Sequence, residues 1–255
     1  MSGSVVLDRR GKVQLIRLAR PDKKNAIDGP MYRALVAALE DGEAAADVAA
    51  HVLLGSPGIF TAGNDIAAFL AAAQTGVALA DDVLAFVRLL PRLTKPLIAG
   101  VDGVAVGIGT TLLLHCDLVY ASPQASFSTP FLALGLVPEA ASSLLMPLRM
   151  GHARAFEMLA LGTTFPAERM VQAGVVNGIV PSADLEVVVT RAAEALAAKP
   201  PEALAAARRL MRGDVDAVCR RIEEEAAVFT ERMRSPEALA AFRGFLDRRT
   251  STGRQ

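Results

Sequence analysis

The sequence predicts an α/β fold: a stacked, spiral core of strand–strand–helix units over residues 1–199, followed by a helical region over 200–255. Two observations predict it. Short strand-like apolar runs recur between helix-like segments in the first region, and the chain after Pro200-Pro201 has only helical patterning. Because a Pro-Pro pair cannot continue a helix, it favours a boundary at this point.

The first elements surround two polar loops. Residues 4–18 alternate apolar and polar positions on both sides of an Arg10-Gly11 turn, which predicts a hairpin. The loop over 20–27 ends at Asp28, which is expected to cap a helix that begins near Pro30 and ends near residue 42. A strand over 51–54 then leads into a glycine-rich loop over 55–65, where the backbone can approach a ligand closely.

The middle of the chain is the most apolar part. Helices are expected over 66–73 and 81–90, strands over 96–106 and 117–121, and a buried helix over 107–115, which is apolar on every side. Beyond it, Glu139 is expected to begin a helix behind Pro138, and helical patterning continues to residue 160 with a break at Gly151. Helices over 166–173 and 183–198 flank a strand over 178–180, and three helical segments follow, ending near Arg249.

Composition excludes several classes of protein. With 27 basic and 27 acidic residues the formal net charge is zero, which argues against a nucleic-acid or membrane partner. Charges or turn residues interrupt every apolar run before it reaches the roughly 18 residues of a membrane span. Cys116 and Cys219 lack the spacing of a zinc site or a disulfide framework, so free thiols and a cytoplasmic location are expected.

Common cofactor motifs are absent as well. The sequence has no GxxxxGK[ST], GxSxG or HExxH, and the third glycine of a dinucleotide fingerprint starting at Gly107 would fall on Leu112. The three histidines are isolated, so no metal site is expected, and His115 fits a packed core position. What remains is a run of unpaired N–H groups at the start of the 107–115 helix and the acid Glu139. An anion hole with a lone acid predicts proton transfer on a carbonyl compound.

Four separated segments resemble motifs of the crotonase (enoyl-CoA hydratase/isomerase) superfamily. They are RPDKKNAI at 20–27, GIFTAGNDIAAF at 58–69, KPLIAGVDGVAVGIGTTLLLHCDLVYAS at 95–122 and SPEALAAFRGFLDRR at 235–249. The resemblance implies a crotonase-type spiral of ββα units with a C-terminal helical trimerisation region. It also implies that the backbone N–H groups of Asn64 and Ile108 form the oxyanion hole. Such donors are worth about 3–4 kcal/mol each at a developing enolate oxygen.

The acid–base residues distinguish branches of this superfamily. The two glutamates that hydratases of the family use would fall on Thr111 and Phe131, so neither carboxylate is present. Glu139 instead matches the single catalytic glutamate of peroxisomal-type Δ3,Δ2-enoyl-CoA isomerases. By its local sequence alone, Glu139 is equally explained as an acid that favours the first turn of a helix.

The resemblance also assigns binding positions. Those that border CoA in the family are matched by Lys24, Ala26, Ala62, Asp65 and Ile66, and tail positions that reach CoA, often from a neighbouring subunit, by Phe245 and Arg248. Apolar residues that either line an acyl pocket or belong to the core are Phe131, Leu132 and Leu136, with Ile66 and Phe69. Arg20 and Lys23 are expected to be solvated loop charges.

Together these features predict a Δ3,Δ2-enoyl-CoA isomerase of fatty acyl-CoA metabolism. CoA would be part of the substrate, and no separate cofactor is expected. The assembly expected is a homotrimer, or a hexamer made of two trimers. The alternatives are an enoyl-CoA hydratase (a lyase) that activates water with Glu139 alone, another acyl-CoA reaction of the superfamily, and a non-catalytic CoA-binding or RNA-binding relative. The zero net charge argues against RNA binding.

Overall fold

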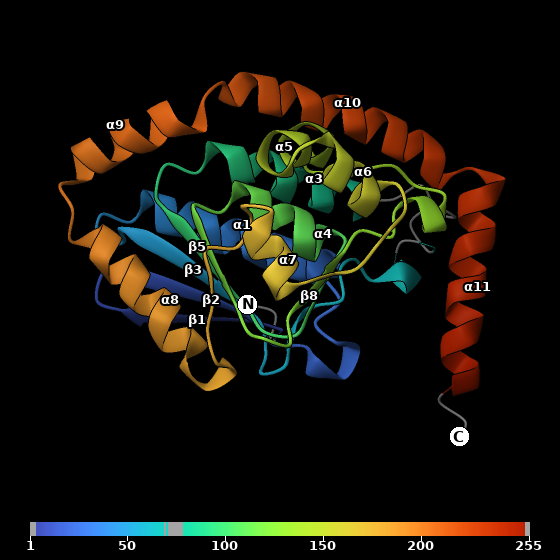
Figure 1. The fold of residues 1–255 in the computed structure, drawn as a ribbon, viewed down its shortest axis with the longest axis horizontal. Helices are drawn as coiled ribbons and strands as arrows, with labels where there is room; N and C mark the ends of the chain where they lie inside the picture. The colour runs from blue at the N-terminus through green and yellow to red at the C-terminus, as the bar shows by residue number, and fades with distance from the viewer. Residues whose placement is uncertain (1–3, 69, 71–78, 253–255) are drawn as a thin grey trace.

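The computed structural model describes residues 4–68, 70 and 79–252, in which two sheets are enclosed by helices (Figure 1). The strands are β1 (Val5–Arg10), β2 (Val13–Leu18), β3 (Ala50–Leu54), β4 (Ile59–Thr61), β5 (Leu97–Val101), β6 (Val104–Val106), β7 (Leu118–Ala121), β8 (Ser126–Ser128), β9 (Phe165–Pro166) and β10 (Gly178–Ile179). The α-helices are α1 (Gly29–Ala44), α3 (Leu79–Leu89), α4 (Ile108–Thr111), α5 (Ser142–Met150), α6 (His152–Leu159), α7 (Ala167–Gln172), α8 (Ser182–Ala197), α9 (Pro201–Arg212), α10 (Val215–Met233) and α11 (Pro236–Thr252). Short 3-10 helices are η1 (Pro21–Lys23), η2 (Leu90–Arg92), η3 (Leu112–His115) and η4 (Leu132–Leu134).

From β3 to β8, successive strands alternate between the two sheets. The larger sheet has the order β1-β2-β3-β5-β7-β10 and the smaller one the order β4-β6-β8-β9. In the pairs β3/β4, β5/β6 and β7/β8, the first strand therefore joins the large sheet and the second joins the small sheet. This repetition confirms the spiral α/β architecture that the sequence predicts, and the hairpin β1–β2 and the Asp28 cap of α1 are confirmed as well.

The large sheet is buried on both faces, and the alternation of its side chains explains how. On β2, Val13 and Leu15 belong to a cluster that α8 covers, whereas Ile16 and Leu18 belong to the main core on the other face. The same alternation separates Leu53 from its neighbours on β3. Because successive strand residues point to opposite faces, a one-residue slip would exchange these two cores.

The strand expected over 96–106 is two strands, because the chain turns at Asp102-Gly103. Gly103 has φ +71, and a Cβ at this position would lie 1.9 Å from the carbonyl oxygen of Gly58. Only glycine therefore allows this corner. The corner carries the chain from β5 in the large sheet to β6 in the small sheet, and the short strands β4 and β8 on either side of β6 were not predicted.

The segment over 107–115 is also not the single α-helix that was expected. It consists of one α-helical turn, α4, followed by η3, and all its residues from Ile108 to His115 are buried. A single turn has only a small dipole, so the N–H groups at its start contribute as individual donors rather than as the end of a long helix.

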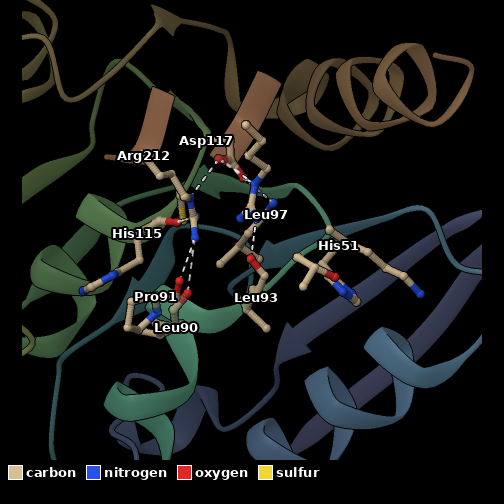
Figure 2. A network of polar contacts seen from close by, with 12 residues as sticks. His51, Leu90, Pro91, Leu93, Leu97, His115, Asp117 and Arg212 are labelled. Carbon is tan, nitrogen blue, oxygen red and sulfur yellow. Dashed lines mark hydrogen bonds and ion pairs between the residues drawn. The ribbon is translucent and has the colours of Figure 1, made fainter. Parts of the chain in front are cut away.

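Of the three helices after Pro200, α10 packs most extensively against the body, whereas α9 contacts it mainly through its arginines. In Figure 1, α9 and α10 run end to end across α5 and α3, and α10 contributes Val218, Ile222 and Met233 to the main core. From α9, Arg212 donates to the carbonyl oxygen of His115 and pairs with Asp117 (Figure 2). No helix in the described part of the chain is both long and apolar enough to cross a bilayer.

Candidate active site

Two polar loops are joined by backbone hydrogen bonds at the entrance to the site. The N–H of Ile27 donates to Gly63 (2.8 Å), and the N–H of Asp65 donates to Ile27 (3.0 Å). The buried side chain of Asn25 fixes the first loop from within, because its amide donates to the carbonyl oxygens of Ile59 and Phe60. Asn25 is part of the RPDKKNAI segment, and the structure gives it this structural role.

The second of these loops also contacts the loop before α4. Gly63 has φ +84, and a Cβ there would lie 2.6 Å from the carbonyl oxygen of Val106. This close approach brings the predicted oxyanion donors, the N–H groups of Asn64 and Ile108, to neighbouring backbone segments. Neither N–H has an acceptor among the described residues, and the N–H of Ile108 has none within α4 because Ile108 is its first residue. Both remain candidate donors for a ligand.

The side chain of Asn64 is held by a residue that the sequence did not single out. The buried hydroxyl of Tyr32 on α1 donates to Oδ1 of Asn64. Burial, and secondly the charge of Glu139, keep the pKa of Tyr32 well above its usual range, so the hydroxyl retains its proton. Tyr32 lies in an ordinary helical pattern, and nothing in the neighbouring sequence indicates its hydrogen bond with Asn64.

Glu139 does not begin a helix, which corrects the sequence-based expectation. Helix α5 begins at Ser142, and the two residues after Glu139 adopt left-handed conformations, with φ 57 at Ala140 and φ 55 at Ala141. Non-glycine residues in this region are strained, and consecutive pairs are uncommon. The interpretation of Glu139 as an acid in a first helical turn is therefore wrong.

The carboxyl group of Glu139 is buried and only half satisfied. Thr111 donates its hydroxyl to Oε1, whereas Oε2 has no hydrogen-bond partner among the described residues. Burial raises the pKa of Glu139 to about 8, the Thr111 hydroxyl opposes this rise, and the nearby Glu225 adds to it. A carboxyl group with this pKa can both accept and return a proton near neutral pH.

A second carboxylate, Glu225 on α10, lies near Glu139, but both of its oxygens accept hydrogen bonds from backbone N–H groups. One oxygen accepts from the N–H of Ala141 (2.7 Å) and the other from the N–H of Ser143 (2.9 Å). The ring of His115 lies against the same turn, 2.8 Å from the carbonyl oxygen of Ala140. No local pattern indicated Glu225, because it lies within a run of three glutamates on an amphipathic helix.

Two small apolar cavities meet at Asn64 and Phe229. The first, of about 40 Å³, has Glu139 and Glu225 in its wall and is otherwise lined mainly by apolar residues of α3 and α10. The second, of about 80 Å³, is lined by Ala62, Gly63, Asn64, Ile66, Val106, Gly107, Pro130, Phe131, Leu134, Leu136 and Phe229. The structure thus brings Ala62, Ile66, Phe131 and Leu136 together beside the oxyanion loops. Leu132 is 48% exposed and lies outside both cavities.

The remaining predicted CoA positions lie on the paired loops. The N–H of Ala62 donates to Lys24 (2.9 Å), and Ala26 is buried next to it. Asp65 is engaged by Arg20, whose guanidinium donates to it at 2.9 Å and also pairs with Asp28. Arg20 is therefore a partly buried loop-fixing residue, which corrects its expected role as a solvated charge; Lys23 is exposed as expected.

Some expected features lie outside what the structure describes. Phe69 is not among the described residues, as is also true of residues 71–73 of the expected 66–73 helix. Phe245 and Arg248 lie on α11, but their side chains are outside the described part. Among the residues that are described, no cluster of His, Cys, Asp or Glu side chains could hold a metal ion.

Comparisons with known proteins show which family the chain resembles. The family model for enoyl-CoA hydratase/isomerase matches residues 8–253. The chain is 33% identical to enoyl-CoA delta isomerase 2 of Rattus norvegicus over 97% of its own length and 64% of the relative's length. It is 29% identical to the 2,3-dehydroadipyl-CoA hydratase of Escherichia coli, over 96% of both chains. The chain thus spans less than two thirds of the isomerase it matches.

Solved structures agree in fold. OdaA of Pseudomonas aeruginosa superposes with a TM-score of 0.91 at 39% identity, covering 96% of this chain and 99% of that one. An enoyl-CoA hydratase/isomerase of Pseudoalteromonas atlantica superposes with a TM-score of 0.90 at 32% identity, covering 96% and 97%. The alternating sheets, the paired loops over 20–27 and 55–65, and these matches lead to one conclusion: the chain belongs to the enoyl-CoA hydratase/isomerase family, within the crotonase superfamily.

Proposed function

We propose that the protein is a Δ3,Δ2-enoyl-CoA isomerase that acts on fatty acyl-CoA thioesters. The observation that carries the proposal is that Glu139 lies in the wall of the cavity that Asn64 also lines, and that its Oε2 has no hydrogen-bond partner in the part of the chain that the structure describes. Glu225, the other carboxylate in that wall, has both oxygens occupied by backbone N–H groups. A single available base is sufficient for isomerisation, whereas the hydratases of this superfamily use two acids.

The residues at the two positions where hydratases of the family carry glutamates also support isomerisation. Thr111 provides a hydroxyl that donates to Glu139, and Phe131 provides a buried apolar wall in the second cavity. Neither can activate water as a general base. Their arrangement favours proton transfer within a water-poor pocket.

The reaction follows from these groups. The N–H groups of Asn64 and Ile108 would donate hydrogen bonds to the thioester oxygen, and the carboxylate of Glu139 would remove a proton from C2. The electron pair of the broken C2–H bond forms a dienolate whose negative charge rests on the thioester oxygen, where the two donors stabilise it. Glu139 then returns the proton to C4, so that the double bond moves from C3=C4 to C2=C3 and the enzyme regains its initial state.

CoA would lie along the paired loops. Their proposed CoA contacts are Lys24, Ala26, Ala62, Asp65 and Ile66, and the proposed acyl contacts are Phe131 and Leu136. Phe245 and Arg248 on α11 are proposed to reach CoA from the same or a neighbouring subunit. CoA belongs to the substrate, and the mechanism uses no further cofactor.

The test compares a 3-enoyl-CoA with a 2-enoyl-CoA on the purified protein. Conjugation of the double bond with the thioester changes ultraviolet absorbance, so both isomerisation and hydration can be followed directly. We expect isomerisation to be the faster reaction and hydration of the conjugated substrate to be slow. Rapid hydration with negligible isomerisation would replace the proposal with a hydratase that uses Glu139 alone.

We also propose a homotrimer, which could pair into a hexamer. Large apolar side chains remain exposed on three neighbouring helices of the single chain: Leu148 on α5, Phe156 on α6, and Leu210 and Met211 on α9 are 73%, 57%, 80% and 78% exposed. Subunit contacts would remove this surface from water. Light scattering during size-exclusion chromatography should give about three or six times the chain mass of 26.8 kDa. A stable monomer at micromolar concentration would contradict this assembly.

A further inference from the structure

The turn that carries Glu139 has an unusual backbone, although it is closed by a hydrogen bond of its own from the N–H of Ser142 to the carbonyl oxygen of Glu139 (3.0 Å). Ala140 and Ala141 both adopt left-handed conformations, and neither is a glycine. The turn also lacks a side-chain cap from its own residues, because the N-cap Ala141 of α5 has no polar side chain. The direction of the Glu139 side chain therefore depends on contacts from other elements.

Two distant residues supply these contacts. Glu225 accepts hydrogen bonds from the N–H groups of Ala141 and Ser143, at 2.7 and 2.9 Å, and is only 7% exposed. His115 contacts the carbonyl oxygen of Ala140, and burial lowers the pKa of His115 to about 4, so the neutral ring donates Nε2–H there. Figure 2 shows this ring directed away from Arg212, which instead holds the His115 carbonyl oxygen.

We propose that Glu225 is a positioning residue: its carboxylate fixes the backbone after Glu139 so that the free oxygen of Glu139 faces the cavity. Both carboxylates lie in the wall of the same cavity, although 84 residues separate Glu225 from the Ala141 N–H that it binds. The inference rests on the proposed role of Glu139 as the base. It assigns no proton transfer to Glu225, whose oxygens are both occupied.

Glu225 would affect Glu139 in two separate ways: by fixing the position of the turn and by its own negative charge. Burial raises the pKa of Glu225, and the hydrogen bonds from Ser143 and Ala141, with the charge of Arg221 on α10, oppose this rise and favour the charged form. Helix α4 contributes the Thr111 hydroxyl, α1 contributes the neutral Tyr32, and α3 lines the cavity with apolar residues only. The charge of Glu225 thus disfavours a second charge on Glu139. Without it, the pKa of Glu139 should fall below its present value of about 8.

The experiment uses Glu225→Gln and Glu225→Ala, with Glu231→Gln as the matched control. Gln keeps the size of the side chain and one accepting oxygen but removes the charge, whereas Ala removes both hydrogen bonds. Glu231 is exposed on the same helix, so its replacement makes the same chemical change away from the turn. All variants are first compared with the wild type by circular dichroism.

We expect kcat for 3-enoyl-CoA isomerisation to fall about 10-fold in Glu225→Gln and about 10²-fold in Glu225→Ala, with KM nearly unchanged, because misplacement of a reacting group by about 1 Å has effects of this size. The acid limb of kcat/KM should lie at lower pH in Glu225→Gln than in the wild type. A residue with only a structural role would lower stability without moving this limb. Glu231→Gln should match the wild type in every respect.

A second measurement is independent of the reaction. Infrared spectroscopy of the free protein can follow the protonated carboxyl band that disappears in Glu139→Gln, and its pH midpoint should be lower in Glu225→Gln. If the wild type lacked isomerase activity but the midpoint still shifted, the proposed function would fail while the coupling of Glu225 to Glu139 would stand. A folded Glu225→Gln variant with unchanged kcat, unchanged acid limb and unchanged band midpoint would overturn the proposal. If Glu225→Ala does not fold, the isosteric Gln variant decides.

Discussion

Glu139→Gln should lower kcat for isomerisation of a 3-enoyl-CoA by about 10²–10⁴-fold, the usual effect of losing a general base. Glutamine has nearly the same size and polarity but cannot accept the C2 proton. KM should change little, because the proposed CoA contacts lie on the loops around Lys24 and Ala62. The measurement is the appearance of the conjugated thioester by ultraviolet absorbance, with wild type and variant at equal concentration.

The same substitution should also change how the stability of the protein depends on pH, which provides an independent check on the variant. A buried acid whose pKa rises from its ordinary value of 4.5 to about 8 binds a proton in the folded state that the unfolded chain releases. The free energy of unfolding of the wild type should therefore fall as pH rises from about 4.5 through 8, and Glu139→Gln should lack this loss. Thermal unfolding at pH 6 and pH 9 checks it. Isomerase activity that survived in a folded variant would place the base elsewhere.

Ile108→Pro should lower kcat by about 10²–10³-fold, because it removes one of the two N–H donors proposed for the enolate oxygen. The position suits this experiment. Ile108 is the first residue of α4, where proline is tolerated and no intrahelical hydrogen bond uses its N–H. The preceding Gly107 has no Cβ to clash with the proline ring, and its carbonyl oxygen still accepts from Thr110 and Thr111.

Ile108→Val provides the matched control, because it shortens the side chain but preserves the N–H. It should cost packing in the core and leave kcat close to that of the wild type. Circular dichroism establishes that both variants are folded. A folded proline variant with near-normal turnover would show that Ile108 is not an oxyanion donor.

The sequence predicted the order of the elements better than their partition between sheets. The alternating hairpin, the Asp28 cap and the break at Gly151 are local signals, and all three are present in the structure. The corner at Gly103 was missed because its requirement for glycine comes from the carbonyl oxygen of Gly58, 45 residues earlier. A contact over that distance leaves no mark in the local pattern of the strand.

The proposed site shows the same limit. Motif resemblance identified the residues proposed to carry the chemistry, Asn64, Ile108 and Glu139, because these lie in characteristic segments. It did not identify Tyr32 or Glu225, which lie on helices with ordinary amphipathic patterns and form hydrogen bonds with a distant segment. The helix expected at Glu139 was wrong for a related reason: the left-handed pair that follows is held by tertiary contacts, and two alanines in isolation would favour a helix.

The sequence separation of these contacts has a consequence for the time at which the site forms during folding. Thr111 and Glu139 are 28 residues apart, Tyr32 and Asn64 are 32 apart, and Ala141 and Glu225 are 84 apart. Closing such loops costs chain entropy before any contact repays it, and proteins rich in distant contacts fold slowly. Helix α10 emerges late from the ribosome, so a nascent chain that ends before it would lack the carboxylate that holds the Glu139 turn. Catalytic competence should therefore be among the last properties that the chain acquires during synthesis, after both sheets have formed.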